Sequence, residues 1–591
     1  MQITYRNNTL ERLTVFVNVI VSVVVSASFV IMLGFKTTLI DLNILHTVQV
    51  SAFFCFLVEK IFRFINAKNR AVYLRAIWFE FPLLLILVIV MAAAGRYAET
   101  IEPAMIRITA VWVYLVLQVV DKVCRTTVYL ISSGRNPTKL LIFCFVALIM
   151  AGAGLLMLPR SYNCENVSFI DALFTATSAT CVTGLTVKDT GIDFSLAGQS
   201  IIMCLIQLGG LGIMVFGAVF AMLLRQATSV KESVAMQDAL SGETLSKIGV
   251  MIGFIFTATI IIESVGAFLL YGMWSDAIAG PAQIEQHKIF SSIFHSVSAF
   301  CNAGFGLATR NLVDYRQNWQ VYGVICQLII IGGLGFGVIY DIVRLVTEKI
   351  KIVIFKRTKH KKNVQVEMPK RLTLQTKIVL SVSAILIVAG AILLLVFERC
   401  YGNSNFDWRD AYFQSVTSRT AGFNTVDIGK MSSAGKMIIT ILMFIGGSPG
   451  STAGGIKTVT LCVIIMTAWA NIRKRNEVEI FKRSIKPAIV GRAITVTLVF
   501  SAVLFAATML LAITERHNNF ALENIIFEAT SAIGTVGLST GLTTSLTSSG
   551  KLIIIILMLI GRLGPLTLLA SLTFNTKPGR YSYPNGTLVV G

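Results

Sequence analysis

The stretch TSATCVTGL at residues 177–185 decides the fold, because the chain repeats its pattern three more times. The later copies are VSAFCNAGF at 297–305, SVTSRTAGF at 415–423 and TSAIGTVGL at 530–538. The shared glycines follow one another at spacings of 120, 118 and 115 residues and are Gly184, Gly304, Gly422 and Gly537. An aromatic residue stands ten positions before each of them, at Phe174, Phe294, Tyr412 and Phe527. Such internal repetition predicts four copies of one structural unit.

A second glycine pattern follows each of these turns, with its first glycine 24 to 28 residues after the turn glycine: LGGLG from Leu208, IGGLG from Ile331, IGGSPG from Ile445 and IGRLG from Ile560. Each unit is therefore predicted to hold a spanning helix, a short amphipathic segment, a glycine turn and a second spanning helix. The short segment, residues 170–179 in the first unit, cannot cross roughly 30 Å of hydrocarbon. Irregular backbone at membrane depth is tolerated only where protein buries it or where it lines a watery cavity. Four re-entrant loops therefore predict one central pore.

The composition places the chain in a bilayer. Of its 591 residues, 55% are hydrophobic and only 14% are charged, with a mean hydropathy of +0.76. These values exclude a soluble enzyme and a disordered chain. Leu13 to Phe35 contains no charge over 23 residues, which is too long for a signal-peptide core. With eleven further apolar stretches, this segment predicts an all-α polytopic membrane protein of twelve spanning helices.

The basic residues predict the orientation. The chain carries a formal charge of +21, and eleven basic residues against two acidic ones fall between Arg344 and Lys377. Short basic loops between apolar segments are typical of the cytoplasmic side. We expect a multi-pass protein of the cell inner membrane with both termini cytoplasmic. We also expect the loops to contact a partner or anionic lipid, and we expect no nucleic acid.

The repeat boundaries predict five parts of the chain. Residues 1–138 form an N-terminal four-helix membrane extension outside the repeat, for which packing or assembly is the expected role. The four pore repeats are predicted at residues 139–225, 247–345, 372–471 and 487–574.

The glycine turns suit a dehydrated cation, because a ring of backbone carbonyls can replace its hydration shell. Glycine permits the unusual dihedral angles that aim successive carbonyls at one axis. The candidate filter residues are the four turn glycines with their neighbours Val182, Thr183, Asn302, Ala303, Thr420, Ala421, Thr535 and Val536. The alternative is that these glycines only allow close helix packing.

Two motifs carry a resemblance to a known family: SRTAGFNTVD at 418–427 and GGSPGSTAGGIKT at 446–458. Over residues 139 to 574 the chain resembles the Trk/Ktr/HKT potassium transporters, most closely their KtrB-like pore subunits. The resemblance implies potassium as the substrate, passing a filter made by the four turn glycines. In that family a serine in the first turn is associated with sodium transport, and this chain has Gly184 there. The resemblance also implies a homodimer on a separate cytosolic ring of regulatory subunits that bind nucleotide. No covalent cofactor is expected.

The second motif must interrupt a helix, since its residues 446–456 hold five glycines and a proline without a charge. Similar proteins use this segment as an intramembrane gate, and a passive kink is the alternative. The candidate gate residues are Gly446, Gly447, Ser448, Pro449, Gly450, Ser451, Thr452, Gly454, Gly455 and Lys457, with Arg562. Family resemblance implies that Arg562 projects toward the pore beside this loop, whereas a structural ion pair is the alternative. Glu263, mid-span in the second unit, is either its partner or a packing residue.

Two other functions compete with potassium uptake through a gated filter. A sodium-selective or sodium-coupled cation transporter would have the same fold. More remotely, GGSPG fits the G-x-S-x-G pattern of an intramembrane serine hydrolase, although none of the five histidines supplies a clear base. Outside the filter, Asp189, Asp314 and Asp427 either attract cations or are solvated loop charges. Arg419 is expected to anchor the third pore helix.

Overall fold

The computed structural model describes most of the chain, and the remaining residues are left aside. The described residues are 6–36, 40–70, 111–112, 114–115, 137–163, 167–212, 248–274, 281–358, 372–402, 406–475, 477–518 and 520–564. Within them the elements are almost all helical, as predicted. The exception is one two-stranded hairpin, β1 (Glu479–Ile480) with β2 (Arg483–Ser484). Among the predicted spans, the one that begins near Phe81 lies outside the described residues, as do most of the one that begins near Met105 and both chain ends.

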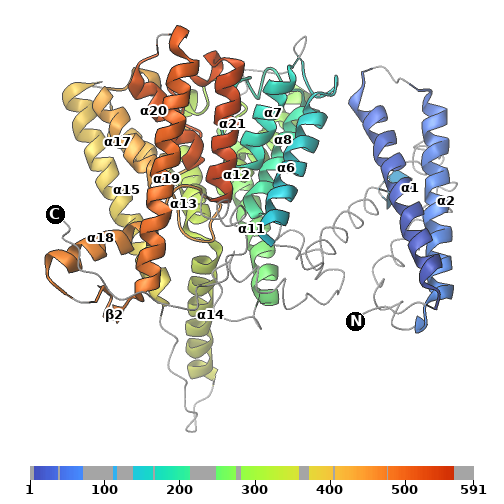
Figure 1. The fold of residues 1–591 in the computed structure, drawn as a ribbon, viewed down its shortest axis with the longest axis horizontal. Helices are drawn as coiled ribbons and strands as arrows, with labels where there is room; N and C mark the ends of the chain where they lie inside the picture. Colours follow the sequence, from blue (N-terminus) through green and yellow to red (C-terminus); the bar gives the residue numbers. More distant parts are fainter. Residues whose placement is uncertain are drawn as a thin grey trace, which may run out of the picture.

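Each repeat contributes three helices to one bundle (Figure 1). The first helices are α6 (Pro137–Leu156), α11 (Ile248–Leu270), α15 (Leu374–Tyr401) and α19 (Pro487–Thr514). The short re-entrant helices, called pore helices below, are α7 (Phe169–Thr180), α12 (Pro281–Phe300), α16 (Trp408–Thr417) and α20 (Leu522–Gly534). The second helices are α8 (Leu196–Leu211), α13 (Cys326–Leu334), α17 (Ser433–Phe444) and α21 (Ser548–Leu563).

Three of the second helices, α8, α17 and α21, begin at hydroxyl caps, Ser195, Ser432 and Thr547, which satisfy amides that a helix start leaves free. In repeats 3 and 4 the first helix holds this cap as well. The Glu398 carboxylate at the end of α15 accepts from Ser432 Oγ at 2.6 Å. Glu515, just after α19, accepts from Thr547 Oγ1 at 2.6 Å. One buried carboxylate therefore fastens the outer ends of two helices.

In repeats 1, 2 and 4 the second helices end earlier than the sequence predicts, whereas the break in repeat 3 is the predicted one. Gly212, Gly335 and Gly564 follow α8, α13 and α21 with φ of 81°, 89° and 83°, values that glycine adopts freely. After Gly335 the chain turns by 100° into α14 (Phe336–Thr358). In repeat 3 the 446–457 loop separates α17 from α18 (Thr458–Ile472). Of the twelve predicted spans, the described residues therefore contain four helices that are long and apolar enough by themselves, or five with the bent pair.

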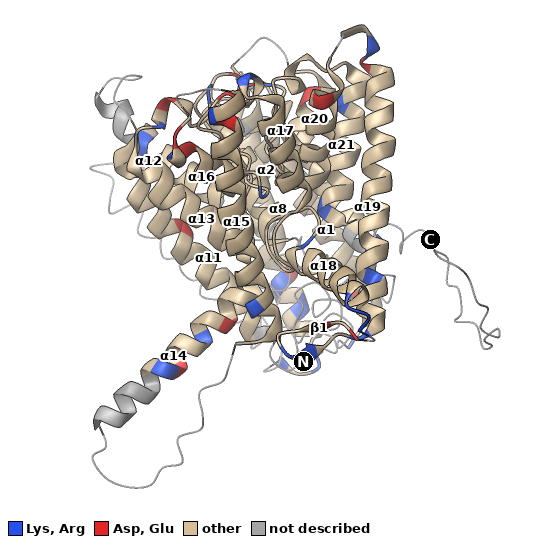
Figure 2. Ribbon diagram, turned by 90° about the vertical axis from the view of Figure 1, so that its left-hand side faces the viewer, with Lys and Arg blue, Asp and Glu red and all other residues tan. Residues whose placement is uncertain are grey.

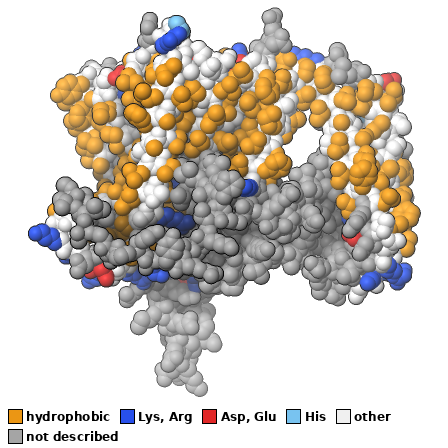
Figure 3. Space-filling model, viewed as in Figure 1, with side chains coloured by type: hydrophobic (Ala, Val, Ile, Leu, Met, Phe, Trp, Pro, Cys, Tyr) orange, Lys and Arg blue, Asp and Glu red, His pale blue; other side chains and the backbone are white. Residues whose placement is uncertain are grey.

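Hydrophobic side chains cover the sides of the bundle, and charged side chains gather at its two ends (Figure 3). The exposed apolar residues include Phe268, Phe505 and Ile385, at 81%, 70% and 65%. A surface of this kind requires a lipid environment. α14 leaves the bundle at one end and carries charges along its length (Figure 2). The chain is therefore built as a multi-pass membrane protein.

The N-terminal pair α1 (Asn8–Gly34) and α2 (Leu42–Asn66) stands beside this bundle (Figure 1). It has a small apolar core of its own around Val25, Phe53 and Phe56. It also buries a hydrogen bond of 2.5 Å between Asn18 and Glu59. One described contact with the bundle is the hydrogen bond from the Arg160 amide to the Gly34 carbonyl at 2.9 Å.

Three helical glycines let the second helices touch the ends of pore helices. A Cβ on Gly209, Gly332 or Gly561 would lie against a backbone carbonyl oxygen. These oxygens belong to residues four positions before the turn glycines: Thr180, Phe300 and Ile533. Backbone carbonyls cannot move aside as a flexible side chain can, so the first glycine of the second pattern is a packing requirement.

We predict that Gly209→Ala lowers the free energy of unfolding by about 1–3 kcal/mol, the usual cost of overpacking. The matched control is Gly154→Ala in α6, where an added Cβ meets nothing within 4 Å. There the helix preference of alanine should raise stability by up to about 1 kcal/mol. The thermal unfolding midpoint of each variant in detergent measures both effects. Equal midpoints for the two variants would contradict this packing account.

Candidate functional site

The four turn glycines meet around one axis. A Cβ on Gly184 would collide with the carbonyl oxygen of Ala303, one on Gly304 with that of Ala421, one on Gly422 with that of Val536, and one on Gly537 with that of Thr183. Each oxygen belongs to the residue just before the next repeat's glycine. The contacts therefore run from repeat 1 through 2, 3 and 4 and back to 1. We call this closed arrangement the glycine ring.

The backbone of the ring has the unusual dihedral angles expected from the sequence. The four glycines have φ of 91°, 70°, 79° and 92°. The residue two positions before each glycine also has a positive φ, although it carries a side chain. These residues are Val182, Asn302, Thr420 and Thr535, with φ of 57°, 59°, 75° and 50°. Such conformations persist only where the surroundings enforce them, and they cluster at functional sites.

Hydroxyl groups on the pore helices enforce this geometry. The Gly184 amide donates to Ser178 Oγ at 3.0 Å, and the Gly537 amide donates to Ser531 Oγ at 3.1 Å. In repeat 2, Ser298 Oγ donates to the Phe305 carbonyl at 2.8 Å. In repeat 3 the equivalent position is Val416, and Thr417 Oγ1 one residue later donates to the Phe423 carbonyl at 2.6 Å.

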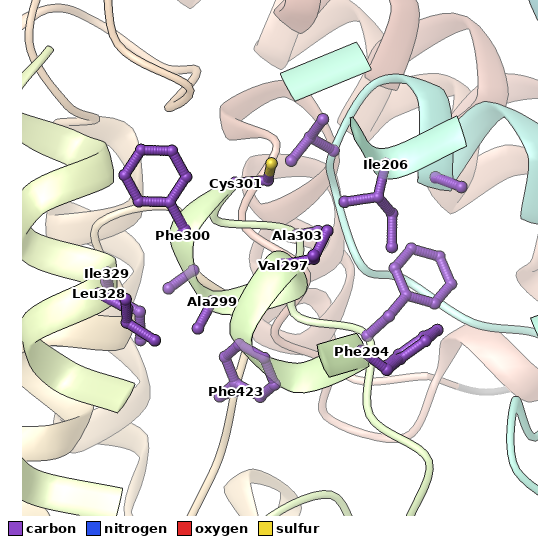
Figure 4. Close-up of a cluster of buried hydrophobic side chains, with 14 of the residues drawn as sticks. Ile206, Phe294, Val297, Ala299, Phe300, Cys301, Ala303, Leu328, Ile329 and Phe423 are labelled. Carbon is purple, nitrogen blue, oxygen red and sulfur yellow. The ribbon is translucent and has the colours of Figure 1, made fainter. Parts of the chain in front are cut away.

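Apolar side chains pack behind the ring and exclude other conformations. Figure 4 shows the end of α12 between Ile206 of α8 and the pair Leu328 and Ile329 of α13. Phe294 and Phe423 both lie toward one end of the cluster in Figure 4, and both are fully buried. The turns of neighbouring repeats thus share one core, which fixes their relative positions.

The 446–457 loop is closed at its neck by backbone hydrogen bonds. The Gly446 amide donates to the Ile456 carbonyl at 3.0 Å, and the Thr458 amide donates to the Gly447 carbonyl at 3.0 Å. Lys457 Nζ donates into the loop, to the Ala453 carbonyl at 2.7 Å. The segment is therefore an ordered loop with its own internal bonds.

The same loop contacts the repeats on both sides. Thr452 Oγ1 donates to the Gly332 carbonyl at 3.2 Å, and the Ser448 amide donates to the Gly333 carbonyl at 3.1 Å, both in repeat 2. Toward repeat 4, a Cβ on Gly454 would collide with Thr535 Oγ1. Because Thr535 is one of the left-handed residues, the loop lies directly against the glycine ring.

Arg562 joins three repeats. From α21 its guanidinium donates to the Thr452 carbonyl in the loop and to the Gly209 carbonyl in α8, with a further bond of 3.2 Å to Gly210. Its described hydrogen bonds are therefore to carbonyls, and they place it beside the loop as the resemblance implies. Glu263 instead accepts from Gln207 at 3.1 Å, which favours the packing role. Five donors in a fixed fork let arginine bind several carbonyls together.

The remaining predicted residues have structural contacts. Arg419 donates to Ser383 Oγ on α15 at 3.0 Å and so points away from the ring. Asp189 accepts from the amides of its own turn. Asp314 and Asp427 pair with Arg310 at 3.2 Å and Lys430 at 3.5 Å. For the three aspartates, these contacts favour a role in holding the loops over a role in attracting cations.

Sequence reasoning missed the ion pairs that link neighbouring repeats beside the pore helices. Lys551 of α21 contacts Asp171 of α7 at 2.7 Å, and Arg316 contacts the buried Asp410 of α16. Both acids lie in the first turn of a pore helix, where a carboxylate also suits the helix dipole. An acidic residue in the first turn of a pore helix was therefore the signal in the sequence. It does not reveal the basic partners, which are 380 and 94 residues away along the chain.

Comparison with known proteins decides the family. A family model described as "TrkH: Cation transport protein" matches residues 106–577. The chain belongs to this family. It is 39% identical over 472 residues to the Ktr system potassium uptake protein B of Bacillus subtilis, covering 77% of this chain and 97% of that protein. It is 38% identical over 465 residues to the potassium/sodium uptake protein NtpJ of Enterococcus hirae, with the same coverage.

The fold is also that of a solved family structure. The potassium transporter TrkH from Vibrio parahaemolyticus superposes with a TM-score of 0.58, covering 84% of this chain and 98% of that one at 18% sequence identity. The family resemblance carried by the two sequence motifs is thus confirmed. The family model begins at residue 106, so α1 and α2 lie outside it.

We predict that Arg562→Gln loosens the 446–457 loop, because glutamine cannot reach Thr452 and Gly209 together. Loss of hydrogen bonds to a charged donor, at about 1.5–3 kcal/mol, should speed amide exchange in the loop by about tenfold or more. Hydrogen–deuterium exchange of the purified protein measures the exchange rate of the loop amides. The control is Arg475→Gln, which removes an exposed pair with Glu479 and should leave the loop unchanged. Unchanged exchange in Arg562→Gln would show that the bonds do not hold the loop.

Proposed function

We propose that this protein takes up potassium across the cell inner membrane, and that the glycine ring is its selectivity filter. The observation that carries the proposal is the closed order of contacts, in which every turn glycine faces the carbonyl before the next one. Such carbonyls are the ligands that replace water around a dehydrated cation. The names of the relatives, potassium uptake and potassium/sodium uptake, support the same substrate class.

The ring works by exchanging ligands. A potassium ion sheds water as it enters and is held by carbonyls of the twelve filter residues named from the sequence. The membrane potential then drives it inward with about 2.3 kcal/mol per 100 mV. Since this electrical term is downhill, the movement requires no bond chemistry within the chain. The proposal therefore includes no enzymatic step.

The 446–457 loop and Arg562 form the gate in this proposal. Their support is the contact of Gly454 with Thr535, which puts the loop next to the ring. The guanidinium beside the loop carries a positive charge where a cation must pass, and basic groups raise the barrier for cations in pores. Opening then requires that the bonds from Arg562 and Thr452 to repeats 1 and 2 be broken.

We also propose a homodimer attached to a separate cytosolic ring of nucleotide-binding subunits, as the family resemblance implies. The relative's name, protein B of a Ktr system, supports a multi-component assembly. In this proposal α14, which projects from the bundle and carries charged side chains (Figure 2), meets such a ring or anionic lipid. This assignment puts both termini in the cytoplasm.

Flux into liposomes tests the function. Purified protein should admit potassium in preference to sodium under a negative internal potential. A sodium-selective or sodium-coupled carrier would show sodium uptake that external potassium does not change. Ser448→Ala tests the hydrolase alternative, in which Ser448 would be the nucleophile. Among the described side chains, Ser448 Oγ is hydrogen-bonded to the Thr458 hydroxyl at 3.5 Å. A threonine hydroxyl cannot act as the general base that a serine nucleophile needs. This variant should still transport potassium.

We predict that Gly184→Ser lowers the preference for potassium. The new Cβ would collide with the Ala303 carbonyl, and φ of 91° is strained for any side chain. The control is Gly212→Ser, which has similar strain at φ 81° but no atom within 4 Å of a Cβ. Ratios of potassium to sodium permeability in liposomes should fall for the first variant only. An unchanged ratio in both would remove Gly184 from the filter.

A further inference from the structure

One position on the pore helices differs between repeats in a way that the filter proposal leaves unexplained. Nine residues before the turn glycines stand Thr175, His295, Phe413 and Glu528. His295 and Glu528 belong to repeats 2 and 4, which face each other across the ring because the contacts run in the order 1, 2, 3, 4. Both side chains are buried, at 0% and 1% exposed.

Glu528 holds the segment that follows the repeat 4 glycine. Its Oε1 accepts from the Thr540 amide at 3.2 Å and from the Ser539 hydroxyl. Its Oε2 accepts from Thr543 Oγ1 at 3.0 Å. A carboxylate is thus surrounded by three donors, all within six residues of Gly537. A buried carboxyl group is retained only where donors compensate for lost hydration.

His295 makes the corresponding bond in repeat 2. Its Nδ1 lies 2.8 Å from the Ser291 carbonyl, which can only accept, so Nδ1 carries the hydrogen. Nε2 is then the acceptor for the Leu307 amide at 3.3 Å. Leu307 and Thr540 both stand three residues after their turn glycines. An acidic and an imidazole side chain therefore do the same task at equivalent positions.

The other two repeats lack this bond at the same position. Thr175 donates back to the Asp171 carbonyl of its own helix at 2.9 Å, and Phe413 has no acceptor. In repeat 3 the third residue after the glycine, Thr425, instead donates through its side chain to Asp410 at 3.3 Å. The amide bracing is thus specific to one facing pair of repeats.

We propose that Glu528 and His295 are positioning residues that fix the outer ends of two facing turns and so determine how strongly the ring prefers potassium over sodium. The inference rests on the proposed function. Its physical reason is that a smaller ion needs carbonyls to move closer together. In repeat 4 the turn is held at the Gly537 amide by Ser531 and three residues later by Glu528. In repeat 2 it is held at the Phe305 carbonyl by Ser298 and at the Leu307 amide by His295. A turn held at two points in this way opposes that movement.

The test compares variants that keep shape but differ in accepting capacity. Glu528→Leu removes every acceptor, whereas Glu528→Gln keeps one oxygen for the Thr540 amide. The ratio of potassium to sodium permeability in liposomes should fall about tenfold for the leucine variant, as for a lost bond to a charged group. It should stay within about twofold of the unmodified protein for the glutamine variant. His295→Phe, which keeps a ring without an acceptor, should lower the ratio as well.

Glu515→Leu is the matched control. Glu515 is 2% exposed and accepts from three donors, the Thr547 amide and hydroxyl and Asn518, but it lies at the end of α19 away from the ring. This variant should lose stability and keep the permeability ratio. If Glu528→Leu fails to assemble, His295→Phe decides, and an unchanged ratio in the assembled variant overturns the inference. A lack of potassium preference in the unmodified protein would overturn the proposed function itself.

Discussion

The fold depends on one close approach: four backbone turns pass so near each other that none has room for a Cβ. At each turn glycine the space for that atom is taken by a carbonyl oxygen of the neighbouring repeat. Everything around the ring serves to hold this arrangement. Pore-helix hydroxyls fix the turns, helical glycines let α8, α13 and α21 press on the pore helices, and ion pairs such as Lys551–Asp171 join one repeat to the next.

The sequence was sufficient for the repeat and the family, and the reason is physical. A close backbone approach admits only glycine, so the constraint can be read from the glycines at residues 184, 304, 422 and 537. The same is true of the second glycine pattern. In repeat 3 the predicted interruption is confirmed by the 446–457 loop between α17 and α18. In repeats 1, 2 and 4 the segment ends a helix with a positive φ, so unbroken second spans were the wrong expectation there.

Contacts between distant residues could not be predicted in this way. Nothing in the letters around Arg562 indicates that its guanidinium meets Thr452 and Gly209, which are 110 and 353 residues away. Likewise His295 and Glu528 differ in chemistry, so their equivalence shows only when both are seen to accept the amide three residues after a turn glycine. The roles assigned to the filter and gate residues stay predictions until flux is measured.

Because a single polypeptide supplies all four turns, the assembly is free to be asymmetric. The 446–457 loop belongs to repeat 3, yet it reaches repeats 2 and 4 and, through Arg562, repeat 1. A ring made from four identical subunits would carry the same segment four times. Joining the units end to end therefore lets one repeat carry a segment of its own, and lets each quarter of the ring change its chemistry by separate mutation.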